Sequence, residues 1–109
     1  MATFATNRKA GFNYEILERF EAGIELFGFE VKSILKGNAH LEGGRVLIRG
    51  TEAFLVGVTI PPYQAHNTPA DYEPDRTRRL LLHKKEISHL AGKQSQQGLT
   101  LVPIKLYNK

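Results

Sequence analysis

Basic residues gather in one short part of the sequence and give the clearest sign of chemistry. Within ten residues stand three arginines and two lysines: Arg76, Arg78, Arg79, Lys84 and Lys85. An arginine offers forked N–H donors that match a phosphate or a guanine edge, whereas a lysine is a mobile point charge. A solvated loop leading into a helix would have the same composition, so charge alone leaves both interpretations open.

Three leucines, Leu80-Leu81-Leu82, lie inside this basic cluster. Unpaired RNA bases need apolar stacking surface as well as charge, so an exposed apolar residue among arginines favours RNA binding over simple solvation. We expect two of the leucines to belong to the core and one to be exposed.

Tyr14 and Glu21 are two further candidates near the start of the chain. Tyr14 could be a core aromatic or a stacking platform, and the local pattern favours the core. Glu21 would repel phosphate, so it is either a solvated residue or an acceptor of N–H groups from a base edge. The residues alone do not choose between these alternatives.

Catalytic and metal-binding patterns are missing from the sequence. The four histidines include no pair at i, i+4, and there is no cysteine, so a zinc site is not predicted. The glycine-rich stretch from Gly37 to Arg45 lacks the Lys-Ser/Thr of a phosphate-binding loop, and no nucleophile elbow is present. We expect no enzyme activity, no metal and no cofactor.

Composition limits the class of protein. A chain of 109 residues with 41% hydrophobic and 24% charged residues is typical of one globular domain. Its net charge of +4 permits a polyanionic partner. No run approaches the ~18 apolar residues of a membrane span, and the absence of cysteine suits a reducing compartment, so we expect a cytoplasmic protein without a membrane partner.

Hydrophobic periodicity predicts a mainly β fold with two or three short helices. A half-buried strand is expected over 14–22, continuing past Gly23 toward Gly28 as a curved strand or a strand pair. Further strands are expected at 45–49, 54–60, 80–82 and 99–107, helices at 29–36 and 84–97, and a long surface loop at 61–75. This order of elements predicts a small oligonucleotide-binding (OB-type) β-barrel with flanking α-helices, one domain over 1–109 with a flexible segment at 1–11.

Five segments in register give the sequence a resemblance to a known family. They are Asn7-Arg8-Lys9-Ala10, Phe20-Glu21-Ala22-Gly23-Ile24, Glu30-Val31-Lys32-Ser33, Arg79-Leu80-Leu81-Leu82-His83-Lys84 and Gly98-Leu99-Thr100-Leu101-Val102-Pro103. In order and spacing they resemble the SmpB (SsrA-binding protein) family. The match covers nearly the whole chain from Asn7 onward.

The resemblance implies both fold and function. It implies an OB-type barrel that grips the transfer-RNA-like domain of transfer-messenger RNA (SsrA). That RNA is brought, with elongation factor Tu, to a stalled ribosome, where trans-translation tags the incomplete peptide for degradation. The protein itself would catalyse nothing.

Family RNA-binding positions fall on particular residues of this chain. The resemblance places them at Tyr14, Glu21 and Leu81. Surrounding residues are expected to contact phosphates or bases, and these are Asn7, Lys9, Arg79 and Lys84.

The chain departs from the family pattern in three places. Phe12 stands where many members carry histidine, and Gly43-Gly44-Arg45 replaces a more usual Asp/Gly-Ser-aromatic sequence. The family also continues through a further strand and a basic tail beyond the point where this chain ends. We therefore expect RNA binding without support of tagging.

Two other functions fit the residues less completely. One is a general single-strand-binding barrel, which would tolerate many RNA sequences. The other is a protein-interaction domain or an enzyme that binds no RNA.

Overall fold

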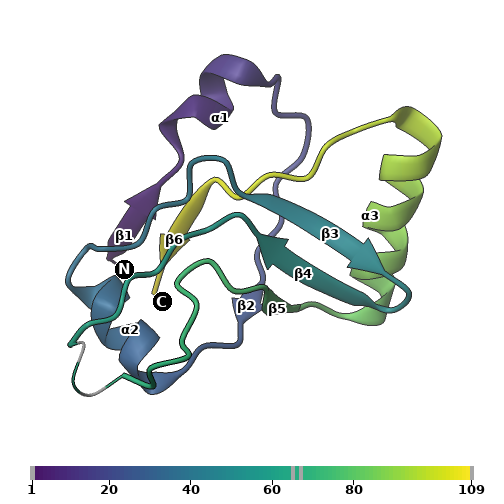
Figure 1. The fold of residues 1–109 in the computed structure, drawn as a ribbon. Helices are drawn as coiled ribbons and strands as arrows, with labels where there is room; N and C mark the ends of the chain where they lie inside the picture. The colour runs from purple at the N-terminus through teal and green to yellow at the C-terminus, as the bar shows by residue number, and fades with distance from the viewer. Residues whose placement is uncertain (1, 65, 67, 109) are drawn as a thin grey trace.

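Nine helices and strands make up the part of the chain that the structure describes. The structure is a computed structural model and describes residues 2–64, 66 and 68–108. In chain order the elements are β1 (Thr3–Thr6), α1 (Arg8–Asn13), β2 (Gly23–Ile24), α2 (Gly28–Leu35), β3 (Arg45–Arg49), β4 (Glu52–Val56), β5 (Arg78–Leu81), α3 (Lys84–Gln97) and β6 (Lys105–Tyr107) (Figure 1).

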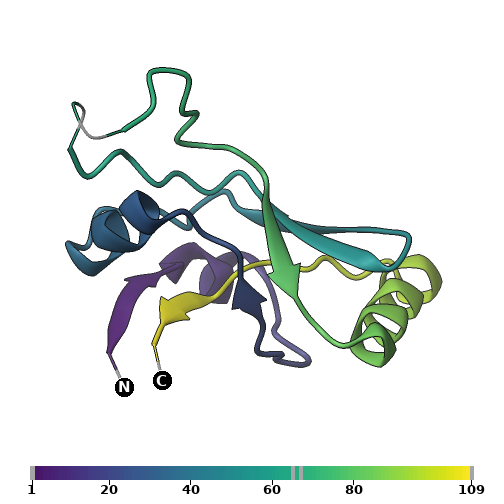
Figure 2. The ribbon, with the colours of Figure 1, turned by 90° about the horizontal axis from the view of Figure 1, so that it is seen from below.

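The strands form two antiparallel sheets. The larger sheet has the order β2-β5-β4-β3, and the smaller one pairs β1 with β6, so that the two ends of the chain lie side by side (Figure 2). The predicted mainly β class with a few helices is confirmed. Within the described residues the two sheets stay separate, and no closed barrel is seen.

One hydrophobic core lies between the two sheets. Leu55 of β4, Ile34 of α2 and the loop residue Leu41 are buried there. Phe4 of β1 and Leu106 of β6 pack against this cluster, so the small sheet covers the inner face of the large one. Burial of apolar surface on this one face fixes which residues of the large sheet remain on its outer face.

The β3–β4 hairpin forms where the sequence predicts it. β3 covers the predicted range, whereas the second strand ends at Val56, four residues before the predicted end at Ile60. Gly57 ends it, because its φ of 74° lies in the left-handed region that strands do not use. Val58 and Ile60 are nevertheless fully buried, which explains their alternating pattern in the sequence.

Both predicted helices are confirmed. α2 begins and ends one residue before the predicted range, and α3 has the predicted bounds. Ile87 and Leu90 form the buried side of α3, and Gly98 ends it with a φ of 64°.

The predicted strand over 14–22 is wrong. Only Gly23–Ile24 pairs with another strand, and residues 17–22 are exposed on both parities. Alternating sequence favours an extended backbone, but a strand also needs a neighbour at hydrogen-bonding distance, and β5 extends only far enough to pair with β2. The predicted strand over 99–107 is likewise reduced to Lys105–Tyr107.

The N-terminal segment carries two elements that the sequence did not predict. Within the expected flexible region 1–11 the structure places β1 and the first part of α1. The partner of β1 is β6, about a hundred positions away, and no local pattern indicates such a pairing.

Candidate nucleic-acid interface

Alternation along β5 separates a buried face from an exposed one. Arg78 is fully buried and Leu80 is half-buried, whereas Arg79 and Leu81 point to the outer face of the sheet. Leu81 is 47% exposed, which is high for a leucine in a strand. One leucine is exposed as predicted, but only Leu80 packs against the core, because Leu82 is half-buried and lines a groove instead.

Glu21 approaches the same strand from the side of β2. Gly23 of β2 lies opposite Leu81, and Glu21 stands two residues before Gly23 in an exposed position. The Glu21 carboxylate accepts a hydrogen bond from the Tyr107 hydroxyl. The acidic residue is therefore held beside β6 while it remains open to solvent.

Tyr14 and Glu21 share a groove that Leu81 does not enter. The groove has a volume of about 700 Å³ and is lined by both residues, by Leu80 and by Leu82. The Leu81 side chain points to the opposite face of the sheet from Leu80 and Leu82, so it lies on the outer face. The structure thus brings Tyr14 and Glu21 together and leaves Leu81 on an adjoining surface.

The cationic candidates are exposed and only weakly tied. Arg79 Nη1 lies 3.1 Å from Glu25 Oε1, and Lys9 Nζ lies 3.7 Å from Glu42 Oε2. Exposed ion pairs of this kind contribute little to stability, so both cations can exchange their partner for a phosphate. Lys84 is exposed at the first position of α3.

Asn7 occupies a different kind of position. It is 7% exposed, and its side-chain Nδ2 donates to the Pro103 carbonyl at 2.9 Å. Its backbone N–H donates to the Ile104 carbonyl at 2.7 Å. Asn7 therefore fastens the start of α1 to the C-terminal segment, and its direct contact with RNA stays a prediction that burial does not favour.

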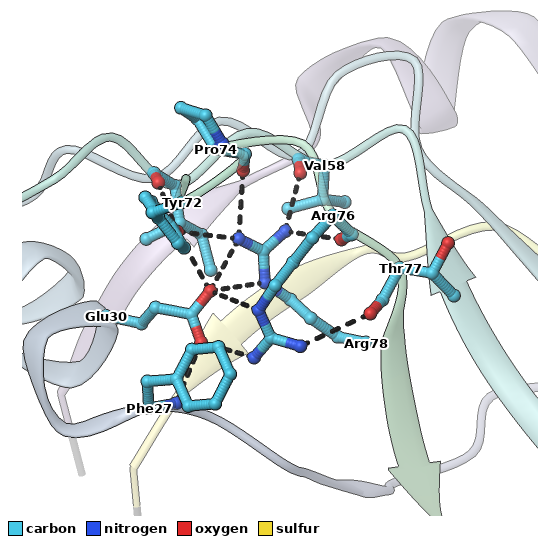
Figure 3. Close-up of polar contacts among 9 residues, drawn as sticks. Phe27, Glu30, Val58, Tyr72, Pro74, Arg76, Thr77 and Arg78 are labelled. Atoms are coloured by element: carbon cyan, nitrogen blue, oxygen red, sulfur yellow. Dashed lines mark hydrogen bonds and ion pairs between the residues drawn. The ribbon is translucent and has the colours of Figure 1, made fainter. Parts of the chain in front are cut away.

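A buried ion cluster behind β5 was not predicted from the sequence. The Glu30 side chain is fully buried at the start of α2 and accepts hydrogen bonds from both Arg76 and Arg78 (Figure 3). Tyr72 also donates to Glu30 Oε2, at 2.9 Å. Arg78 donates further to the carbonyls of Val58, Pro74 and Arg76.

The Glu30 carboxyl stays ionised over a wide pH range. Burial would raise its pKa, but hydrogen bonds from Arg76, the Phe27 N–H, Arg78 and Tyr72 outweigh burial and lower the pKa to about 2. Burial and the neighbouring carboxylate also raise the pKa of the Tyr72 hydroxyl.

This Glu30 cluster changes the interpretation of the basic segment. Arg76 and Arg78 are ion-paired with the buried Glu30. The cations of that segment that face solvent are therefore Arg79, Lys84 and Lys85. The described residues of 61–75 form no α-helix or strand, as predicted for a long loop. The cluster holds this loop in place, because the Tyr72 hydroxyl and the Pro74 carbonyl both bond to it. The burial of Arg78 could have been predicted from the alternation of the strand, because Arg78 lies on the same face as Leu80.

A second set of contacts joins the segment 14–22 to α3. Glu18 forms ion pairs with Lys93 at 3.0 Å and with His89 at 3.5 Å, and the Phe20 ring lies 5.8 Å from the His89 ring. The hydrogen bond from Lys93 is the main cause that lowers the pKa of the Glu18 carboxyl. These contacts hold the unpaired segment near the helix.

Two features of other functional classes are missing from the described residues. No group of three or more histidine, cysteine, aspartate or glutamate side chains is placed to hold a metal ion in that part of the chain. No helix among the described residues is long and apolar enough to cross a membrane.

Comparison with known proteins identifies the family. The family model described as SmpB protein matches residues 4–109. The chain belongs to the SmpB family. Among curated members, it is 56% identical over 103 residues to the SsrA-binding protein of Gloeothece citriformis and 53% identical over 105 residues to that of Nostoc punctiforme.

The shared region is nearly all of this chain but only part of those SmpB proteins. It covers 94% of this chain and 66% of the Gloeothece protein, and 96% of this chain and 68% of the Nostoc protein. The chain therefore spans about two thirds of the length of these relatives. A solved SmpB structure described as "tmRNA-SmpB: a journey to the center of the bacterial ribosome" superimposes with a TM-score of 0.76 at 45% identity, covering 95% of this chain and 72% of the other.

Three of the five segments that carry the SmpB resemblance contribute to this surface or lie directly behind it. Phe20–Ile24 supplies Glu21 and β2, and Arg79–Lys84 supplies the exposed part of β5 and the start of α3. Glu30–Ser33 supplies the buried carboxylate behind β5.

Proposed function

We propose that this chain binds the transfer-RNA-like domain of transfer-messenger RNA and acts in trans-translation on stalled ribosomes. Its relatives are named SsrA-binding proteins, which supports transfer-messenger RNA as the ligand. The solved SmpB structure is named with tmRNA and the bacterial ribosome, which supports a role on the ribosome. The observation that carries the proposal is the position of Leu81, an exposed leucine flanked by Arg79 on a strand that a buried ion cluster holds in place.

The proposed contacts divide into two kinds. Leu81 and Tyr14 offer apolar surface to unpaired bases of a folded RNA loop. Such bases bind where side chains can exclude water from their faces. Glu21 accepts N–H groups from a base edge, and a charged acceptor makes a hydrogen bond about twice as strong as a neutral one. Arg79, Lys84 and Lys9 contact phosphates.

The wider role follows the family. The ribosome and elongation factor Tu are the proposed partners in delivery of the RNA, in the cytoplasm, and the chain is proposed to bind rather than to catalyse. The fold is proposed to be an open relative of the OB-type barrel. Two antiparallel sheets around a shared core, with a helix at the edge, support that assignment.

Titration with the transfer-RNA-like RNA at several salt concentrations tests the proposal. Phosphate contacts require log affinity to fall linearly with log salt. Leu81→Ala should weaken binding by about 10-fold, the loss expected when apolar contact worth about 1.4 kcal/mol is removed. The matched control is Leu35→Ala on α2, since Leu35 is another exposed leucine, at 57%.

The outcomes separate the candidate functions. Affinity that does not change with salt would exclude an RNA-binding surface built on cations. Equal affinity of the two leucine variants would remove Leu81 from the interface.

A further inference from the structure

The outer face of the large sheet carries a line of side chains across three strands. The three strands β3, β4 and β5 are neighbours in this sheet. In the register, Leu47 of β3 lies opposite Phe54 of β4, and Phe54 lies opposite Arg79 of β5. Leu81 shares this face two positions along β5, where its neighbour across the sheet is Gly23. Directly opposed side chains in antiparallel strands lie about 5 Å apart and diagonal neighbours about 7–8 Å, so in this outer patch Leu47 and Arg79 are direct neighbours of Phe54 and Leu81 is its diagonal neighbour.

The apolar members of this outer patch are turned away from the core. The alternate residues of β4, Ala53 and Leu55, are 0% and 5% exposed on the inner face, whereas Phe54 is half-buried and Leu81 is 47% exposed. Neither Phe54 nor Leu81 belongs to the residues that line the groove on the inner side. Gly23 has no side chain to cover Leu81, and an added Cβ there would lie 3.2 Å from the Leu81 Cβ.

Charges around the outer patch suit a polyanion. Arg45, Arg49 and Arg79 stand exposed on the same face of the sheet. Two carboxylates share the face: Glu52 is opposite Arg49 in the register, and Glu25 pairs with Arg79 at 3.1 Å. The arginines outnumber the carboxylates, and Arg45 lies opposite the uncharged Val56, so it is the arginine best placed to meet a phosphate.

We propose that Phe54 is a seat for an unpaired base of the bound RNA, with Leu81 beside it and with Arg45 and Arg79 on the flanking phosphates. The inference rests on the proposed RNA-binding function and extends its surface from β5 across β4 to β3. An aromatic side chain between leucines and arginines on an open sheet provides both requirements of single-stranded recognition, a stacking surface and a cationic border. No other layer of the described chain covers this face, as the two views of the ribbon show (Figures 1 and 2).

Two substitutions at Phe54 test the stacking role. Phe54→Leu keeps an apolar side chain of similar size but removes the aromatic face, and Phe54→Tyr keeps the ring. We expect Phe54→Leu to weaken binding of the transfer-RNA-like RNA by about 5- to 50-fold at each salt concentration, with an unchanged salt slope, because a base contact releases no counterions. Phe54→Tyr should bind within about 2-fold of the unmodified chain.

Arg45→Gln tests the phosphate border independently of the ring. It should weaken binding and reduce the slope of log affinity against log salt by about one. The matched control for Phe54→Leu is Phe27→Leu. Phe27 is also an exposed aromatic residue, at 49%, but its ring lies under Arg76 next to α2 and not on the sheet.

The proposed function and this inference fail in different ways. If the unmodified chain does not bind the RNA, the proposed function is wrong. If it binds and Phe54→Leu binds equally well, only the base seat is wrong. A loss of affinity in Phe54→Tyr as large as in Phe54→Leu would also overturn the stacking role, since the ring is then not what the RNA contacts.

Discussion

Replacing Glu30 with glutamine removes the charge that holds Arg76 and Arg78 behind β5. The pKa of Glu30 falls from 4.5 to about 2 on folding, a difference of about 2.5 units. At 1.36 kcal/mol per pKa unit, the ionised carboxylate makes the folded protein about 3 kcal/mol more stable than the protonated carboxyl would. That is a large part of the ~5–15 kcal/mol by which domains of this size are stable.

The pH at which this stabilisation acts follows from the direction of the shift. The folded-state pKa is lower than the unfolded one, so the stabilisation is fully present above the unfolded pKa of 4.5 and is lost as the pH falls toward about 2. Glutamine has no charge to lose. The stability difference between the unmodified chain and Glu30→Gln should therefore be about 3 kcal/mol at neutral pH and should narrow progressively below pH 4.5.

Urea unfolding followed by far-ultraviolet circular dichroism measures this difference at a series of pH values. Glu42→Gln is the matched control, because Glu42 is an exposed carboxylate whose ion pair with Lys9 at 3.7 Å should contribute less than about 1 kcal/mol. A stability difference for Glu30→Gln that is the same at neutral and acidic pH would refute the reasoning. The effect would then come from packing of the amide and not from the carboxylate charge.

Two glycines should respond in opposite directions to alanine, as thermal unfolding can measure. Gly57→Ala should destabilise the protein by at least about 1 kcal/mol, because Gly57 has a φ of 74° and an added Cβ would lie 2.8 Å from the Gly43 carbonyl oxygen. Gly92→Ala should stabilise it by about 0.5–1 kcal/mol, because Gly92 lies inside α3 and an added Cβ would meet nothing within 4 Å. A Gly57→Ala protein as stable as the unmodified chain would contradict the geometry of the turn after β4.

Local patterns were sufficient for the elements whose partners are close in the chain. The helix α3 has an apolar stripe at Ile87 and Leu90 and a glycine at its end, so its length can be read directly from the sequence. The β3–β4 hairpin has two alternating runs joined at Gly50, and its first strand was predicted to the residue. In both cases the backbone hydrogen bonds that define the element join residues close to each other in the chain.

Elements that depend on distant partners were not predictable in this way. Residues 14–22 alternate like a strand, but in this part of the chain only Gly23 and Ile24 pair with β5, so the alternation predicted an extended conformation without indicating a partner strand. The β1–β6 pair joins Thr3–Thr6 to Lys105–Tyr107 across nearly the whole chain, and neither sequence indicates the other. The choice of partner is a property of the packed core.

The candidate site was predictable for its exposed residues and not for its support. One of the three leucines was expected to be exposed, and the structure shows that this residue is Leu81. Arg76 and Arg78 looked like part of a surface charge cluster, because charged residues are rarely buried unless they are paired. Their partner, Glu30, lies more than forty residues away on α2, so the pairing could not be inferred from spacing.

Competition between two RNAs tests the central claim most directly. A labelled transfer-RNA-like domain is bound to the chain and displaced either by the same unlabelled RNA or by an unstructured RNA of equal length. Recognition of a folded shape predicts that the folded competitor acts at a concentration at least about 10-fold lower, and that Leu81→Ala reduces this preference. Equal displacement by both competitors would contradict the account and would instead indicate a general single-strand-binding surface.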